Sequence, residues 1–322
     1  MAKKQSSAVK QLADQAVVEI ARLKREIAAR DKLIEQQQNR IERLGASKFR
    51  LPTQKTKATR GAFVRVIVPD THGCHIEAHA VNAMFRDLES LRPKEIILLG
   101  DVLECGGFLA EHHTLGYVAQ TGYTYEDDIV AGNMFLDKLQ DICPKASIDY
   151  LEGNHEQRVE KWCVTAALRN QQDATLLMQH HHPANVLHVE KRGIKYYKHG
   201  VRYDDCRIPA TIRRGKCYFT HGFSHGKNAA NAHLAKFAAN IVFGHVHKIL
   251  SASDRTVSDG EIGAHSPGCL CQLQPLWRHS APTDWSHGYG VQLVRPDGDF
   301  LHINVPIIEG RSYLINLTEQ VK

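Results

Sequence analysis

Five short apolar runs in this chain are each followed by side chains that can bind a metal ion. The runs are Val64–Val68, Glu95–Leu99, Ser147–Leu151, Lys216–Thr220 and Ile241–Phe243. The side chains that follow them are Asp70 and His72, then Asp101, then Asn154 and His155, then His221, and finally His245 and His247. The runs are short and rich in β-branched and aromatic residues, which predicts strands. One histidine after a strand is usually structural, but five such strand ends in order indicate a shared site.

Helices are predicted between these strands, over about residues 76–90 and 126–141 and from about residue 156 onward. Strands and helices alternating at this spacing are typical of an α/β fold. Ligands bind such sheets beyond the carboxyl ends of the strands, so we expect the polar side chains to converge there. Carboxylates, imidazoles and an amide carbonyl together are typical ligands of Mn, Fe, Zn or Ni rather than of calcium.

In this order the residues resemble the signature motifs of the calcineurin-like metallophosphoesterase superfamily. The matching segments are Asp70–His72, Gly100–Glu104, Gly153–Glu156, Thr220–Gly222 and Gly244–His247, and the resemblance covers roughly residues 63–310. In motif style it is similar to DNA-repair exonuclease and phosphodiesterase members. The resemblance implies an α/β fold: a β-sandwich flanked by helices in four layers (αββα). A hairpin over Tyr289–Ile308, turning at Pro296-Asp297-Gly298, would supply late strands of the sandwich.

The resemblance also implies a ligand set for two divalent metal ions, with manganese expected and Fe, Zn or Ni as alternatives. One ion would be held by Asp70, His72 and His247, the other by Asn154, His221 and His245, and Asp101 would bridge them. A hydroxide between the two ions would attack phosphorus in line. His155 would be the histidine that binds no metal and stabilises or protonates the leaving oxygen.

Two further candidate catalytic residues are less regular. Glu104 stands where the family usually has an aspartate that orients the non-ligand histidine, and it carries the same charge one methylene farther out. Arg158 follows the Gly153–Glu156 turn and could contact substrate phosphate. A surface salt bridge on the helix is the alternative interpretation of Arg158.

The N-terminal segment has a different pattern. Ile20, Ile27, Ile34 and Ile41 recur every seven residues, and Leu23 and Leu44 fall in the alternate register. This seam within residues 9–44 predicts a coiled coil that makes the chain a homo-oligomer, with a parallel dimer favoured and a trimer as the alternative. We therefore divide the chain into a coiled-coil helix (1–45), a basic linker (46–62) and a metallophosphoesterase domain (63–322).

The positive charge is confined to this N-terminal part. Residues 1–60 contain 15 of the 41 Lys and Arg and 6 of the 35 Asp and Glu, which gives +9 there and −3 in the remainder. A basic arm suits a polyanion, although its cations could equally keep a linker solvated. No run approaches 18 apolar residues and the first residues lack a secretory apolar segment, so we expect a cytoplasmic protein without a membrane partner.

These observations predict a metal-dependent phosphoesterase. A phosphodiesterase or nuclease acting on DNA or RNA is the first hypothesis. A phosphomonoesterase acting on phosphoproteins or nucleotides is the alternative, favoured by the glutamate of Gly153–Glu156. A coiled-coil scaffold with an inactive phosphoesterase domain is a third possibility, and the complete ligand set argues against it.

Overall fold

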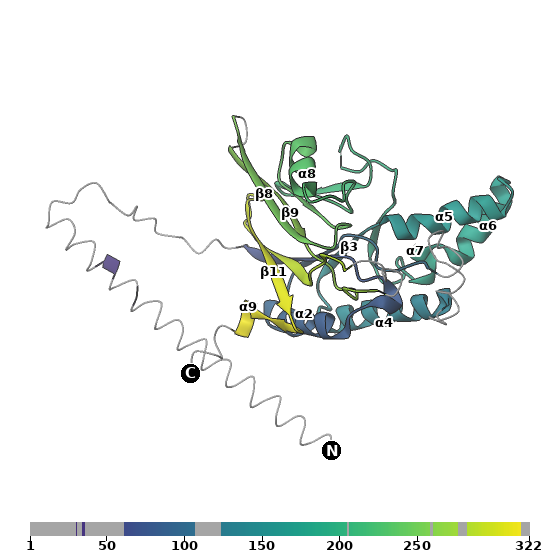
Figure 1. Ribbon diagram of the computed structural model, residues 1–322, viewed down its shortest axis with the longest axis horizontal. Helices are drawn as coiled ribbons and strands as arrows, with labels where there is room; N and C mark the ends of the chain where they lie inside the picture. The colour runs from purple at the N-terminus through teal and green to yellow at the C-terminus, as the bar shows by residue number, and fades with distance from the viewer. Residues whose placement is uncertain are drawn as a thin grey trace, which may run out of the picture. The chain divides into compact units, whose positions relative to one another are not determined.

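The computed structural model describes residues 61–106, 124–204, 206–257, 260–275 and 282–316, together with Arg30, Ile34 and Glu35 (Figure 1). The chain divides into two units, Met1–Ala58 and Thr59–Lys322, and the second is described below. The predicted coiled coil and linker lie almost wholly outside the described residues and remain predictions. Residues 107–123 lie outside them as well.

A mixed sheet of seven strands carries the first three predicted strands. In spatial order its strands are β12 (Arg311–Ser312), β11 (Phe300–Ile308), β10 (Gly288–Val294), β1 (Phe63–Val68), β2 (Glu95–Leu98), β3 (Ser147–Leu151) and β4 (Lys195–Tyr197). Strands β1 to β4 are parallel, and the β10–β11 hairpin pairs antiparallel with β1. The parallel register sets Val68 beside Leu98 and Leu98 beside Tyr150, so the three loops that follow begin at one edge.

A second sheet of five strands carries the last two predicted strands. Its spatial order is β5 (Thr211–Arg214), β6 (Cys217–Thr220), β7 (Ile241–Phe243), β9 (Gly260–Pro267) and β8 (Ile249–Thr256). Strands β6 and β7 are parallel, with Thr220 beside Phe243. Their following loops therefore also leave from one edge.

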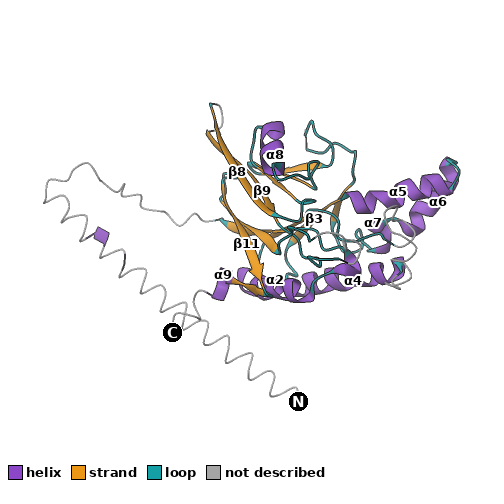
Figure 2. Cartoon of the chain, viewed as in Figure 1, coloured by secondary structure: helices purple, strands orange, loops and turns teal. Residues whose placement is uncertain are grey.

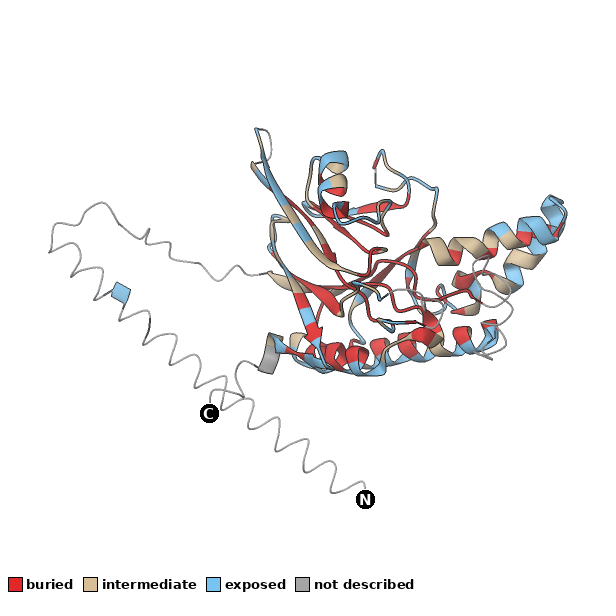
Figure 3. Ribbon diagram, viewed as in Figure 1, coloured by how far each residue is buried: buried red, intermediate tan, exposed pale blue. Residues whose placement is uncertain are grey.

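Helices cover the outer faces of both sheets (Figures 1 and 2). They are α2 (Ala78–Leu91), α4 (Tyr125–Ile142), α5 (Asn154–Ala166), α6 (Gln171–His181), α7 (Pro183–Val186), α8 (Ala229–Phe237) and α9 (Tyr313–Asn316), with a 3₁₀ turn η2 at Gly73–His75. Helices α2, α4 and α5 pack on the seven-stranded sheet, and α8 packs on the five-stranded sheet. Figure 3 shows buried residues alternating with exposed ones along α2, as expected for an amphipathic surface helix.

The alternation of side chains along β1 explains the layered core. Val66 and Val68 point into the core beneath the helices, whereas Ile67 points into the core between the sheets. There Ile67 packs in one cluster with Phe219 and Val242 of the second sheet. The chain therefore has four layers, helix–sheet–sheet–helix, and the predicted fold class is confirmed.

Among the described residues, no helix is both long and apolar enough to cross a membrane.

Candidate metal centre

The loops that follow the parallel strands are bonded to one another at the sheet edge. The backbone N–H groups of Thr71 and His72 donate to the carbonyl oxygen of Asp101 at 3.1 and 3.0 Å. In the second sheet, Gly244 donates to the carbonyl oxygen of His221 at 2.8 Å. These backbone hydrogen bonds alone hold the loops that carry the candidate ligands next to one another.

Asp70, His72 and His247 lie together on one side of the site. The Nε2 atoms of His72 and His247 are 3.0 Å apart, and His247 Nε2 is 3.0 Å from Asp70 Oδ2. The Nδ1 of His72 donates to Glu104 Oε2 at 2.5 Å, which leaves a lone pair on its Nε2. Two ring nitrogens this close need a proton or a cation between them. This contact fits the donor set expected for a transition-metal ion.

Asn154, His221 and His245 gather on the other side, around Asp101. His221 Nε2 lies 2.9 Å from Asn154 Oδ1 and 3.3 Å from Asp101 Oδ2. Its Nδ1 donates to the carbonyl oxygen of Leu99 at 2.9 Å, so Nε2 again keeps its lone pair. Asp101, His221 and His245 each offer a ligand atom within 4.8 Å of the other two.

Asp101 belongs to both sides of the site. Its carboxylate lies within 4.8 Å of ligand atoms of His221 and His245 in one group and of His72 and His155 in another. Burial opposes the charge on Asp101, but His155 and His221 outweigh it and hold its pKa well below the ordinary value. An anionic group shared by two clusters is what a bridging ligand requires, so these residues fit two cations.

The structure also brings together His155, Glu104 and Arg158. His155 Nδ1 donates to the backbone carbonyl of Glu104 at 2.7 Å, and it lies 3.3 Å from Glu104 Oε2. Its Nε2 is 3.7 Å from Asp101 Oδ2. Burial would lower the pKa of His155, but the carboxylates of Asp101 and Glu104 raise it to about 9. The extra methylene of Glu104 lets one carboxylate contact both His72 and His155.

Arg158 extends from α5 toward the same histidine. Its Nη1 lies 3.1 Å from His155 Nδ1. Within the described ranges Arg158 has no carboxylate partner, so the surface salt bridge considered from the sequence is not seen there. Its guanidinium adds positive charge beside His155.

The backbone is strained where it presents the candidate ligands. His72, Asp101, His245 and His247 all adopt left-handed conformations, with φ of 53°, 48°, 69° and 56°. Such values are uncommon outside glycine and concentrate at functional sites. Gly244 makes room for the carboxylate of Asp70, because a Cβ at position 244 would lie 2.6 Å from Asp70 Oδ1.

Glu156 has a supporting role that the sequence analysis did not assign. Its buried carboxylate accepts hydrogen bonds from the backbone N–H groups of Asp101, Val102, Leu103 and Gly153 and from the Tyr150 hydroxyl, at 2.7–3.1 Å. Burial and the charge of Asp101 raise the pKa of Glu156 to about 7. An acidic residue three positions after a helix N-cap is a sequence signal that could have revealed part of this role.

Asp128 and Cys271 were also missed. Asp128 of α4 accepts from the backbone of Cys74, Glu104 and Cys105 at 2.7–3.3 Å and so fixes the loop that carries Glu104. No local sequence pattern links it to that loop. The buried thiol of Cys271 lies within 4.8 Å of ligand atoms of His72 and His247.

No protein-family model and no curated protein matches the chain. Solved structures with similarity include Yfce, a phosphoesterase from E. coli, at 16% identity and TM-score 0.32, covering 75% of this chain and 98% of that one. Vps29 from Entamoeba histolytica is 11% identical with TM-score 0.36, covering 77% and 95%. Nuclease MPE from Pseudomonas putida is 12% identical with TM-score 0.27, covering 74% and 87%. At these TM-scores the layered architecture described above, rather than the similarity, defines the fold.

Proposed function

We propose that the chain hydrolyses phosphate esters at this sheet edge with two divalent metal ions. The observation that carries the proposal is the position of Asp101, whose carboxylate lies within 4.8 Å of ring nitrogens of His72 and His155 on one side and of His221 and His245 on the other. Asp70, His72 and His247 would hold one ion, Asn154, His221 and His245 the other, and Asp101 both. When bound, the ions supply positive charge for the phosphoryl oxygens and activate a water molecule near neutral pH.

His155, Glu104 and Arg158 would act on the leaving group and the phosphoryl oxygens. Because Nδ1 of His155 donates to the Glu104 carbonyl, Nε2 is the atom free to face a substrate. The carboxylates of Asp101 and Glu104 stabilise the protonated ring, which can then donate a proton from Nε2 to the departing oxygen. Arg158 would add charge for a nearby phosphoryl oxygen.

For the substrate we propose a nucleic acid, which makes the protein a phosphodiesterase or nuclease. The support is the +9 charge of residues 1–60, since phosphate backbones attract such segments. The feature that favoured a phosphomonoesterase was Glu156, and the structure gives that residue a different role, because it is buried and holds backbone N–H groups.

A substrate panel tests this function. The full-length protein with added manganese is assayed on single-stranded DNA, double-stranded DNA, RNA, p-nitrophenyl phosphate and bis(p-nitrophenyl) phosphate. We expect hydrolysis of the diester and of a nucleic acid, and weaker hydrolysis of the monoester. Preference for the monoester with no cleavage of any nucleic acid would contradict the proposed substrate and favour a phosphomonoesterase.

A further inference from the structure

A basic cavity is lined in part by α5, the helix that begins at the candidate metal ligand Asn154. It has a volume of about 600 Å³, which is within the range of small-ligand sites. Helix α5 forms one wall, with Gln157, Lys161 and Thr165, and the segment after β4 forms another, with Lys198 and His199. Arg169, just beyond α5, also lines it.

Helix geometry relates this cavity to the metal centre. Residues spaced three, four and seven apart share a helix face, so Asn154, Gln157 and Lys161 lie on one side of α5. At 1.5 Å per residue, Lys161 is roughly 10 Å along the axis from Asn154. The face of α5 that carries Asn154 therefore also lines the cavity.

The opposite wall meets the same edge of the sheet. His199 lies two residues beyond the end of β4, which is parallel to β3, the strand that leads to Asn154. The backbone N–H of His199 donates to Glu152, two residues before Asn154, at 2.5 Å. Both walls are thus anchored next to the residues that carry the site.

The charges favour an anion in this cavity. Glu160 is its one acidic lining residue and is neutralised by Lys198 at 2.7 Å. Among the described residues, Lys161 and Arg169 have no carboxylate partner. His199 Nδ1 is buried and has no hydrogen-bond partner in the described part of the chain.

We propose that this cavity binds a phosphate group that neighbours the scissile phosphate along a nucleic-acid strand. Lys161 and Arg169 would pair with that phosphate, and Lys198 would remain with Glu160. The proposal rests on the proposed phosphodiesterase function and adds a subsite that selects substrates with more than one phosphate. Neighbouring phosphates of one strand advance about 3.4 Å along the axis of B-DNA and are farther apart through space, so the roughly 10 Å between Asn154 and Lys161 has room for a phosphate next to the scissile one.

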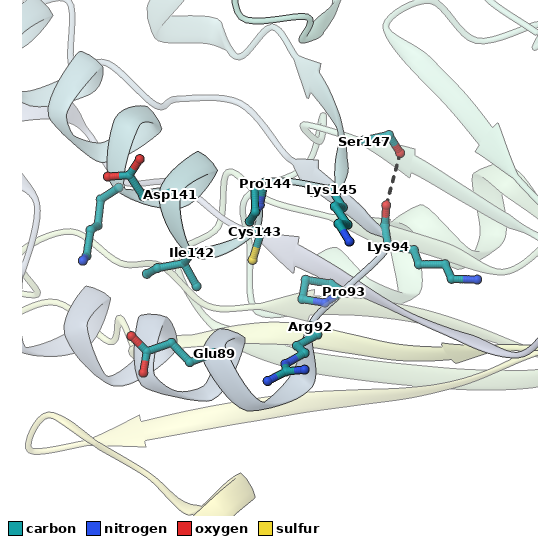
Figure 4. Close-up of a pocket in the computed structure, with 11 residues that line it drawn as sticks. Glu89, Arg92, Pro93, Lys94, Asp141, Ile142, Cys143, Pro144, Lys145 and Ser147 are labelled. Carbon is teal, nitrogen blue, oxygen red and sulfur yellow. Dashed lines mark hydrogen bonds between the residues drawn. The ribbon is translucent and has the colours of Figure 1, made fainter. Parts of the chain in front are cut away.

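A second basic cavity, at the amino ends of β2 and β3, provides a control for the charge of Lys161. This second cavity has a volume of about 930 Å³. Arg92, Lys94 and Lys145 line it (Figure 4), as does Lys138, so it is also basic. Lys138, like Lys161, is an exposed lysine on a helix. It carries the same charge but lies at the edge of the sheet away from the metal centre.

Lys161→Ala and Lys138→Ala are therefore compared in the full-length protein on two substrates. Bis(p-nitrophenyl) phosphate has one phosphate, and single-stranded hexathymidylate has several. We expect Lys161→Ala to lower kcat/KM about three- to tenfold on hexathymidylate, mainly through KM, as for one partly exposed charge-assisted contact. It should leave the one-phosphate ester unchanged, and Lys138→Ala should change neither. Equal effects of Lys161→Ala on both substrates, or none on hexathymidylate, would overturn the subsite.

A binding measurement separates this proposal from the proposed function. Fluorescence anisotropy of labelled hexathymidylate is measured in EDTA, where no turnover is required. Lys161→Ala should weaken binding and reduce the slope of log K against log salt by about 0.7. Unchanged affinity and slope would reject the subsite, whereas failure of the wild type to cleave either ester would reject only the proposed function. ATP is measured as a competitor in the same binding assay. If Lys161→Ala weakens the binding of ATP more than that of hexathymidylate, the cavity binds nucleotides and not a strand.

Discussion

At the residue scale, His155 and Glu104 set the protonation chemistry of the site. Glu104 lies one methylene farther from the backbone than the aspartate expected from the motif, and its carboxylate contacts both His72 and His155. The two histidines in turn hold the pKa of Glu104 well below its ordinary value against the effect of burial. An anionic Glu104 at neutral pH keeps His155 oriented and cationic.

His155→Ala should slow turnover and leave the metal content unchanged. Loss of a general acid typically costs roughly 10²–10⁴-fold, and the loss should be smaller for p-nitrophenolate, a leaving group that needs no proton. The measurement is kcat on p-nitrophenyl and alkyl phosphodiesters, with the exposed His180→Ala as control. An equal loss on both esters would argue against proton donation by His155.

The sequence predicted the candidate ligands because each belongs to a short contiguous motif after a strand. The partners that support them arise from contacts distant in sequence. Asp128, for example, bonds to Glu104 and Cys105 from a helix that follows a long connection. Cys271 reaches His72 and His247 only because the loop after β9 folds back beside β1, where Leu270 bonds to Asp70.

At the scale of elements, strands with a recognisable apolar or alternating pattern were predicted within one or two residues. Val64–Val68 corresponds to β1 (Phe63–Val68), and the hairpin over Tyr289–Ile308 corresponds to β10 and β11. Strand β4 was not predicted, because only Tyr197 of its three residues is buried and the pattern is too short. Its place in the sheet is set by pairing with β3, which no local pattern encodes.

Glu156→Gln should destabilise the loop after β2. A buried amide cannot accept all the backbone hydrogen bonds that the carboxylate now accepts, and it adds donors without acceptors. We expect the free energy of unfolding to fall by about 1–3 kcal/mol in urea titrations. Glu160→Gln, on the same helix but half-exposed, should change it by less than about 1 kcal/mol. Equal effects of the two variants would contradict the supporting role of Glu156.

His302 should make the protein less stable in acid. It lies between the sheets, stacked on His265 of β9 at 4.4 Å, with its Nε2 donating to Asn304 at 2.9 Å. Burial and the His265 charge lower the pKa of His302 to about 3. Below about pH 6.5, therefore, this histidine binds a proton in the unfolded chain but stays neutral in the folded chain. The free energy of unfolding is therefore unaffected by His302 above about pH 6.5. Between about pH 6.5 and pH 3 it falls by about 1.4 kcal/mol per pH unit because of this group.

The check is the pH dependence of Tm for the wild type, His302→Gln and the exposed His79→Gln. The His302 variant should show a shallower loss of stability in acid, and the His79 variant should follow the wild type. If both variants follow the wild type, the folded His302 is not held neutral.

At the scale of the whole molecule, the chain joins a slightly acidic unit that carries the candidate metal centre to a strongly basic N-terminal segment. Deleting residues 1–60 should leave the metal site intact, since every proposed ligand lies beyond Phe63. It should convert an oligomer to a monomer, because the seam from Ile20 to Ile41 is removed. Activity on long DNA should fall and lose much of its salt dependence, while activity on bis(p-nitrophenyl) phosphate persists.

Light scattering and salt titrations check this prediction separately. An unchanged molar mass would contradict the coiled coil. An unchanged salt dependence on DNA would contradict the basic arm as a contact for nucleic acid, leaving it an oligomerisation role.

The proposed activity requires a two-metal centre in which Asp101 bridges both ions. The direct measurement is manganese titration of metal-depleted protein, with bound metal and hydrolysis of bis(p-nitrophenyl) phosphate followed together for the wild type and Asp101→Asn. The wild type should bind two ions per chain and gain activity as both sites fill, whereas Asp101→Asn should bind less metal and stay inactive. Wild-type activity without metal, or two ions and full activity in Asp101→Asn, would contradict a two-metal centre bridged by Asp101.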